Sequence, residues 1–153
     1  MTIAPIVQSV EVKASPARAF ELFTIDFGKW RPAMMTIGAS PSVTVQFEPK
    51  PGGDVFEQAQ DGTTTPWGKV LAWEPPSRLA FTWQISSQWA YDPDLITEIE
   101  VRFEAAGEGR TKVTLTHSKL EAYGADGAKH AETLRNGWPG IMASFGGYAD
   151  ANA

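Results

Sequence analysis

The chain has 153 residues, of which 42% are hydrophobic and 20% charged, a composition that predicts one soluble globular domain with a substantial core. The formal net charge of −5, without a cluster of Lys and Arg, disfavours nucleic acid as a partner. Cysteine is absent, which excludes disulfides, thiolate catalysis and zinc–thiolate sites and fits a reducing, cytoplasmic location.

The N-terminal part of the chain predicts one strand followed by short helices. The first residues carry neither a basic region nor a long apolar run, so neither a signal peptide nor a membrane span is expected. Ile6–Val12 alternates apolar and polar residues, as a half-buried strand does. Ser15 is expected to cap a helix over 16–23, because Pro stands at its first position. A second helical turn is expected over 26–30, before Pro32.

The middle of the chain predicts a meander of antiparallel strands. After a loop over 34–41, short alternating runs are separated by a Pro-Gly-Gly turn, an Asp-Gly hairpin signal and a Pro-Pro pair. The expected strands cover residues 42–48, 55–60, 64–74, 78–85, 95–104 and 110–120. In the strand over 95–104 one face is far more apolar than the other, so Glu98, Glu100 and Arg102 on the second face are expected to meet solvent.

The C-terminal tail changes from the period of a strand to the period of a helix. Its apolar residues form one stripe, made of Leu134, Trp138, Ile141, Phe145 and Tyr148. A helix is therefore expected within 127–148. Pro139 is expected to kink this helix or to mark its true start near residues 136–137.

Together these elements predict an α+β fold of the helix-grip type. A curved antiparallel sheet of about seven strands is expected to wrap around the long C-terminal helix, with one or two short helices after the first strand. The whole chain, residues 1–153, is expected to form this single domain. A cavity should lie between the apolar face of the sheet and the helix.

Several short motifs run through almost the whole chain in this order. They are residues 12–20, the turn at 51–53, and residues 68–71, 73–76, 79–83, 97–103, 114–118 and 137–138. Together they resemble the AHSA-like branch, related to the activator of heat-shock-protein ATPase homologue, of the START/Bet v (SRPBCC) superfamily. The resemblance implies a helix-grip fold with a hydrophobic pocket for a small ligand. It implies no single activity, because members are similar to polyketide cyclases, lipid carriers, stress proteins and co-chaperone domains.

Two side chains are candidates for catalysis. His117 shares a strand face with Val113 and Leu115 and is expected to point inward, where it could act as an acid or base or bind a polar ligand group. The alternative is a structural histidine near the strand end. Glu57 lies on a strand with two mixed faces, as a polar patch in a ligand cavity would. The chain has no nucleophile elbow, phosphate loop or dinucleotide fingerprint.

Aromatic residues are the one notable excess, with six Trp and eight Phe. The residues expected to bind the ligand are Trp30, Phe47, Phe81, Trp83, Trp89, Tyr91, His117, Trp138, Ile141 and Phe145. Trp89 and Tyr91 lie in a loop and are expected to gate the mouth of the pocket. For each tryptophan, simple packing is the alternative. Met34 and Met35 could form an adaptable lid, and Arg31 could attract an anionic ligand.

A metal site and a cofactor are not expected. The two histidines, His117 and His130, lie on different elements, and no His/Asp/Glu spacing fits a ligand set. The remaining partners expected are a small hydrophobic molecule and, through exposed edge strands, a second copy in a homodimer.

Three functions remain open from the sequence. The first is the binding of a small hydrophobic or aromatic ligand in the cavity. The second is an enzyme of the polyketide cyclase, dehydratase or hydrolase type that uses His117 or Glu57. The third is a stress-response or co-chaperone-like interaction module. Titratable groups converging in the cavity would favour the enzyme, an apolar pocket would favour binding, and a large exposed apolar patch would favour the interaction module.

Overall fold

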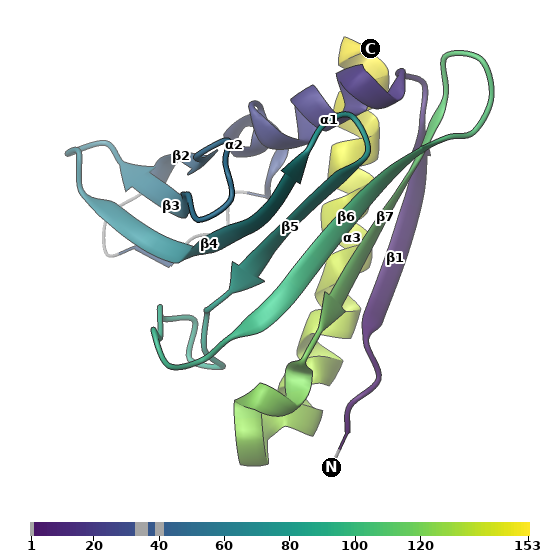
Figure 1. The fold of residues 1–153 in the computed structure, drawn as a ribbon. Helices are drawn as coiled ribbons and strands as arrows, with labels where there is room; N and C mark the ends of the chain where they lie inside the picture. The colour runs from purple at the N-terminus through teal and green to yellow at the C-terminus, as the bar shows by residue number, and fades with distance from the viewer. Residues whose placement is uncertain (1, 33–36, 39–41) are drawn as a thin grey trace.

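The computed structural model describes residues 2–32, 37–38 and 42–153. A seven-stranded antiparallel sheet, in the order β1-β7-β6-β5-β4-β3-β2, curls around one long helix (Figure 1). The strands are β1 (Ile6–Val12), β2 (Ser42–Phe47), β3 (Asp54–Ala59), β4 (Thr64–Glu74), β5 (Arg78–Trp83), β6 (Thr97–Ala105) and β7 (Thr111–Ser118). The predicted helix-grip fold is confirmed.

Four helical segments accompany the sheet. They are α1 (Pro16–Thr24), α2 (Phe27–Trp30), the 3-10 segment η1 (Leu120–Asp126) and α3 (Gly127–Asn152). Ser15 caps α1 as expected, because its hydroxyl accepts a hydrogen bond from the backbone N–H of Arg18 at 3.2 Å.

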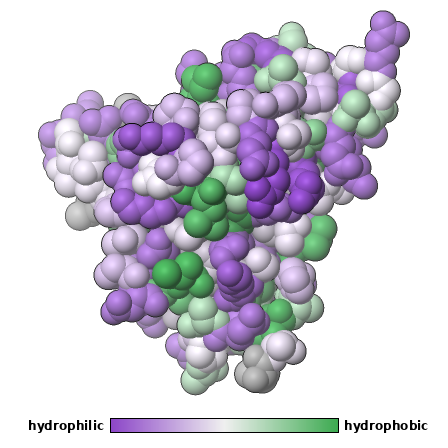
Figure 2. All heavy atoms as spheres, viewed as in Figure 1, coloured by the Kyte–Doolittle hydropathy of each residue, from purple (hydrophilic) through white to green (hydrophobic). Residues whose placement is uncertain are grey.

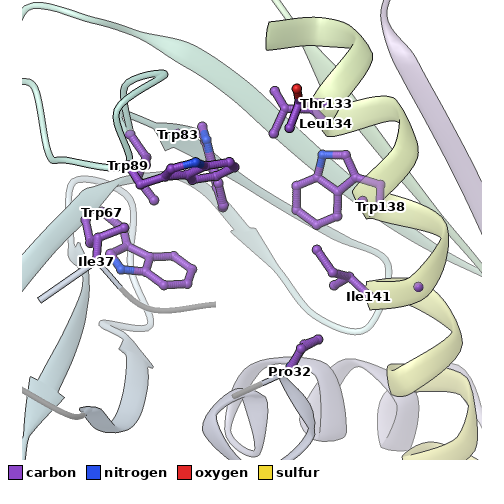
Figure 3. Close-up of a pocket in the computed structure, with 12 residues that line it drawn as sticks. Pro32, Ile37, Trp67, Trp83, Trp89, Thr133, Leu134, Trp138 and Ile141 are labelled. Carbon is purple, nitrogen blue, oxygen red and sulfur yellow. The ribbon is translucent and has the colours of Figure 1, made fainter. Parts of the chain in front are cut away.

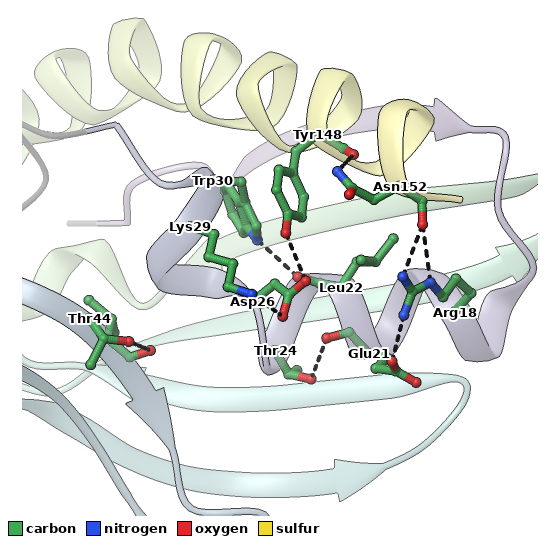
Figure 4. A network of polar contacts seen from close by, with 11 residues as sticks. Arg18, Glu21, Leu22, Thr24, Asp26, Lys29, Trp30, Thr44, Tyr148 and Asn152 are labelled. Atoms are coloured by element: carbon green, nitrogen blue, oxygen red, sulfur yellow. Dashed lines mark hydrogen bonds and ion pairs between the residues drawn. The ribbon is translucent and has the colours of Figure 1, made fainter.

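The short helices are tied to the end of α3 by polar contacts (Figure 4). The Tyr148 hydroxyl donates to Asp26 Oδ2 at 2.8 Å, and the Arg18 guanidinium donates to the backbone carbonyl of Asn152 at 3.0 and 3.2 Å. The Ser144 hydroxyl donates to the carbonyl of Trp30. These bonds close one end of the sheet's concave side.

The helix α3 begins at Gly127, so the expectation that Pro139 marks its start is wrong. Helical conformation continues on both sides of Pro139. Proline has no N–H to donate to the backbone carbonyl four residues earlier. Because Pro139 is exposed, water can hydrate that carbonyl instead.

Two expected strands end earlier in the structure. The strand expected over 78–85 ends before Ile85, because Ile85 forms an isolated bridge with Tyr91 across a tight loop. The strand expected over 110–120 ends before Lys119, whose φ of 61° turns the chain into η1. Ile85 itself lines the cavity described below.

The register of β6 puts its apolar face on the core, as predicted. The strand expected over 95–104 begins at Thr97, and its buried residues alternate with polar ones. On the outer face the Glu100 carboxylate accepts from Arg78 at 2.8 Å and from Arg102 at 2.9 Å. The Arg78 and Arg102 side chains hold the pKa of Glu100 below its ordinary value, although desolvation opposes them.

The outer surface carries its apolar residues in separate places. Among the residues that the structure describes, the large hydrophobic side chains that remain exposed are Val7, Ile25, Leu71, Trp89 and Ile96. Figure 2 shows separate green areas among purple ones on the face it presents, rather than one continuous apolar surface. This face therefore lacks the large patch that an interaction module would favour.

Candidate functional site

A cavity of about 730 Å³ lies between the sheet and α3. Its size is within the range of small-molecule sites. In Figure 3, Trp67 and Ile37 lie across the space from Trp138 and Ile141 of α3, and Pro32 lies below. The lining residues are Pro32, Ile37, Trp67, Trp83, Ile85, Trp89, Thr133, Leu134, Gly137, Trp138, Gly140 and Ile141.

None of these lining residues has a titratable side chain. Four are tryptophans and four are aliphatic residues, while Thr133 supplies the one hydroxyl among them. Such a wall recognises a ligand by dispersion and aromatic contact rather than by charge.

On the helix side of the cavity, a chain of three buried hydrogen bonds positions Trp138. The Trp138 indole N–H donates to Nδ1 of His117 at 3.1 Å, so the imidazole proton must lie on Nε2. Nε2 lies 2.8 Å from the Thr97 hydroxyl, which in turn donates to the Trp83 carbonyl at 2.7 Å. Each donor in the chain therefore has an acceptor.

His117 points inward from β7, on the strand face that the sequence predicted, and its exposed fraction is 0%. Desolvation lowers its pKa from 6.5 to about 3, with a smaller contribution from the charge of His130. Both ring nitrogens are engaged by Thr97 and Trp138, and the ring lies behind Trp138 rather than in the cavity lining. A neutral imidazole so placed acts as an anchor for the indole.

On the opposite wall, Glu57 holds Trp67 in a similar way. Its side chain is 2% exposed, and Oε1 accepts the Trp67 indole N–H at 2.9 Å. The same carboxylate accepts the backbone N–H groups of Ile37 at 2.6 Å and Gly38 at 3.1 Å. Desolvation lowers the pKa of nearby Arg31, and attraction to Glu57 opposes that shift. These donors compensate the burial of the carboxylate.

The two residues predicted as catalytic candidates therefore have the same role on the two walls of the cavity. His117 accepts the indole N–H of Trp138, and Glu57 accepts that of Trp67. Both N–H groups are therefore directed at anchors within the protein, which leaves mainly ring carbon for a ligand to contact. Sequence reasoning found both anchors as unusual residues but did not find the indoles that they hold.

At the mouth of the cavity, Trp89 lies on the loop after β5. It is 47% exposed and has a φ of 59°, a left-handed conformation that is strained for so bulky a residue. Its ring meets the ring of His130 with centroids 5.3 Å apart, and His130 meets Tyr123 at 4.5 Å. Desolvation raises the pKa of Tyr123 to about 12, and its hydroxyl donates to the Ile85 carbonyl at 2.8 Å.

The structure divides the predicted ligand-binding residues between two regions. Four of them line the cavity: Trp83, Trp89, Trp138 and Ile141. Four others lie outside the lining, in aromatic contacts of the core: Trp30, Phe47, Phe81 and Phe145. Tyr91 lies beside the mouth through its bridge with Ile85. The proposed lid residues Met34 and Met35 lie outside the described residues.

Sequence reasoning left several lining residues out of the predicted site. Trp67 and Leu134 were visible as a strand aromatic and a member of the helical stripe, yet nothing local assigned them to the cavity rather than to the core. Gly137 and Gly140 could have been noticed, because glycine is unfavourable within a helix.

Over residues 2–32, 37–38 and 42–153, no group of three or more His, Cys, Asp or Glu side chains could hold a metal ion. In the same part of the chain, no helix combines the length and the apolar character needed to cross a bilayer.

Comparisons with solved structures agree with this architecture. The anthrahydroquino-gamma-pyrone synthase Txn09, solved in complex with SUM, is 37% identical to this chain. The match covers 95% of this chain and 97% of that one, with a TM-score of 0.65. The self-sacrificing resistance protein CalC from Micromonospora echinospora is 29% identical, with coverage of 97% and 96% and a TM-score of 0.69.

A third structure, an Hsp90 activator from Plasmodium falciparum, is 18% identical and covers 91% of this chain and 90% of its own, with a TM-score of 0.60. At this identity it shows the fold alone. No curated protein matches the sequence. Residues 13–150 match the family described as Activator of Hsp90 ATPase homolog 1-like protein. The chain therefore belongs to this family of the SRPBCC superfamily.

Proposed function

We propose that the protein binds a planar, polycyclic aromatic compound in the cavity between the sheet and α3. The observation that carries this proposal is the lining of the cavity, in which four tryptophans face a space of about 730 Å³ and none of the described lining residues has a titratable side chain. Flat aromatic ligands gain most from such walls, because edge-to-face and offset stacking add to the burial of apolar area.

The position of the indole N–H groups supports the same ligand class. Trp67 and Trp138 direct theirs at Glu57 and His117, so these two walls offer few polar anchors. A ligand rich in charge would lose its hydration without compensation there. The 37% identical synthase is named for an anthrahydroquinone-type product, which is itself a polycyclic aromatic compound.

Quenching of tryptophan fluorescence by 1,8-dihydroxyanthraquinone tests the proposal. We expect saturable quenching with a Kd of roughly 1–100 µM, the range that ligand efficiency allows for a compound of this size. Trp138→Phe is expected to weaken binding, since it changes a wall of the cavity. Trp73→Phe is the matched control, because Trp73 contacts Phe20 in the core and is not part of the lining. Linear, non-saturable quenching of the wild type would contradict the proposal.

A second candidate function is an enzyme that closes a ring on such a ligand. The observation that favours it is the 37% identity to an anthrahydroquino-gamma-pyrone synthase. Here the cavity would hold a flexible substituent of the ligand against the ligand's aromatic ring. Correct orientation of two reacting groups can by itself lower the activation free energy by a large amount. Acid–base catalysis by His117 or Glu57 is not part of this candidate, because their polar atoms are engaged behind the walls.

Ring closure of an ortho-hydroxyaryl 1,3-diketone tests this second function. In that reaction the phenol oxygen bonds to the distal carbonyl carbon and one water leaves, which forms a γ-pyrone. We expect an enzyme to raise the rate above that in buffer, and Trp138→Phe to lower it. Saturable binding of the diketone without any rate increase would leave only the binding function.

A further inference from the structure

The wall that α3 contributes to the cavity is centred on a residue without a side chain. Positions three and four residues away on a helix lie on the same face. For Gly137 those positions are Thr133, Leu134, Gly140 and Ile141, and all four line the cavity. Gly137 therefore occupies the middle of this helical wall.

The space in front of Gly137 is open. A Cβ atom built on Gly137 meets nothing within 4 Å outside its own turn of the helix. Gly146 differs, because its Cβ would lie 2.8 Å from Val10 Cγ2, so close packing against β1 explains that glycine. No such contact explains Gly137.

Glycine at this position weakens the helix. A glycine in a helix interior is less favourable than alanine, and Gly137 is exposed, so its replacement would be tolerated by the packing. Glycine in this helix contradicts helix propensity, and no packing contact requires it. Because the residue also lies in the middle of a cavity wall, we expect a functional constraint at this position.

We propose that Gly137 is a specificity-determining position, which lets the edge of an extended aromatic ligand reach the backbone of α3. This inference rests on the proposed binding function and adds a size limit to it. A side chain at residue 137 would project between Leu134 and Ile141 and shorten the cavity from the helix side. Small aromatic compounds would still fit against the contacting rings of Trp67 and Trp83 on the sheet side of the cavity.

Gly147 provides a matched control on the same helix. It is exposed, its Cβ would also meet nothing within 4 Å, and it does not line the cavity. Ala at either position should raise the melting temperature by about 2–4 °C, because both changes remove a glycine from the helix. The two positions thus share their effect on stability and differ in their place relative to the cavity.

The experiment compares Gly137→Ala, Gly137→Leu, Gly147→Ala and Gly147→Leu with two probes, 1-naphthol and 1,8-dihydroxyanthraquinone. We expect Gly137→Leu to weaken binding of the larger probe by about tenfold or more, as overpacking would, and binding of 1-naphthol by less than about threefold. Gly137→Ala should give a smaller change in the same direction. Both Gly147 variants should bind both probes like the wild type.

Three outcomes would overturn the inference. If Gly137→Leu and Gly137→Ala bind the larger probe like the wild type, Gly137 sets no size limit, although the binding function stands. If Gly137→Leu and Gly147→Leu weaken binding of both probes equally, the effect is one of helix stability. If the wild type binds neither probe, the proposed function fails and the inference fails with it. Should Gly137→Leu not fold, the size selectivity of Gly137→Ala decides between these outcomes.

Discussion

The interior has two aromatic regions, one filled and one hollow. In the filled region Phe23 contacts the rings of Phe27, Trp30 and Phe145 with centroid distances of 5.0–5.9 Å. In the hollow region tryptophans surround a cavity of about 730 Å³. Both regions are rich in aromatic side chains, so aromatic content alone does not explain the difference.

What differs is the cover on the sheet's concave side. The filled region receives side chains from α1 and α2 as well as from α3. On its helix side the hollow region is lined by α3, where Gly137 and Gly140 supply no side chain. An aromatic-rich sequence therefore makes a cavity where its helical cover is thin and where buried hydrogen-bond acceptors orient the indoles.

The largest effect is expected in the filled region. Phe23→Ala removes a side chain that is 1% exposed and contacts several rings, so it should lower the free energy of unfolding by about 3–5 kcal/mol. Urea denaturation measures this change. At temperatures where the variant is folded, its affinity for 1,8-dihydroxyanthraquinone should stay near that of the wild type. A large loss of affinity would show that the two regions are not separate.

The second-largest effect on the free energy of unfolding is expected when the pH is lowered. His117 has a pKa of about 3 in the folded protein and an ordinary value of 6.5, so the unfolded chain takes up a proton that the folded one does not. Stability is therefore fully present above pH 6.5 and falls as the pH drops towards 3, at up to about 1.4 kcal/mol per pH unit.

Denaturation of the wild type and His117→Gln at several pH values isolates this contribution. Gln can accept from Trp138 and donate to Thr97 without titrating. The stability difference between wild type and variant should shrink as the pH falls from 6.5. Parallel pH profiles would contradict the neutral, buried imidazole. His130, whose pKa desolvation also lowers, is common to both proteins.

A smaller effect is expected from Glu57→Gln. In the wild type the carboxylate accepts from the backbone N–H groups of Ile37 and Gly38 and from the Trp67 indole. The amide keeps one acceptor oxygen but turns an NH₂ group towards these donors, so roughly 1–3 kcal/mol of stability should be lost. Because Trp67 loses its anchor, its fluorescence and its contribution to ligand binding should change too. Glu98→Gln, on the outer face of β6, is the control and should change neither. An unchanged Trp67 environment in Glu57→Gln would count against the anchoring role.

The smallest change in stability is expected at the mouth. Trp89→Gly relieves the left-handed strain at a residue that is half exposed, so the free energy of unfolding should change by less than about 1 kcal/mol. Ligand dissociation should become faster, because the mouth opens. Stopped-flow displacement of 1,8-dihydroxyanthraquinone measures this rate. An unchanged rate would show that Trp89 does not restrict exit of the ligand from the cavity.

One tryptophan on each side of the cavity could be predicted from local patterns. Trp83 and Trp138 were expected to form walls because they lie on the apolar faces of a strand and a helix, and both do. Phe81 and Phe145 carried the same pattern, yet they lie in the filled region. Periodicity reports which face is buried, but it does not report whether another side chain already fills the space.

Alternation, caps and turns, which act over a few residues, predicted the succession of strands, the inward face of β6 and β7 and the long C-terminal helix. The family was indicated by the resemblance of the short motifs. The anchoring of indoles by His117 and Glu57, and the place of Gly137 at the centre of a wall, became visible in the folded structure. Those roles depend on contacts between residues distant in sequence, such as Trp138 with His117, and no local pattern encodes the distance between them.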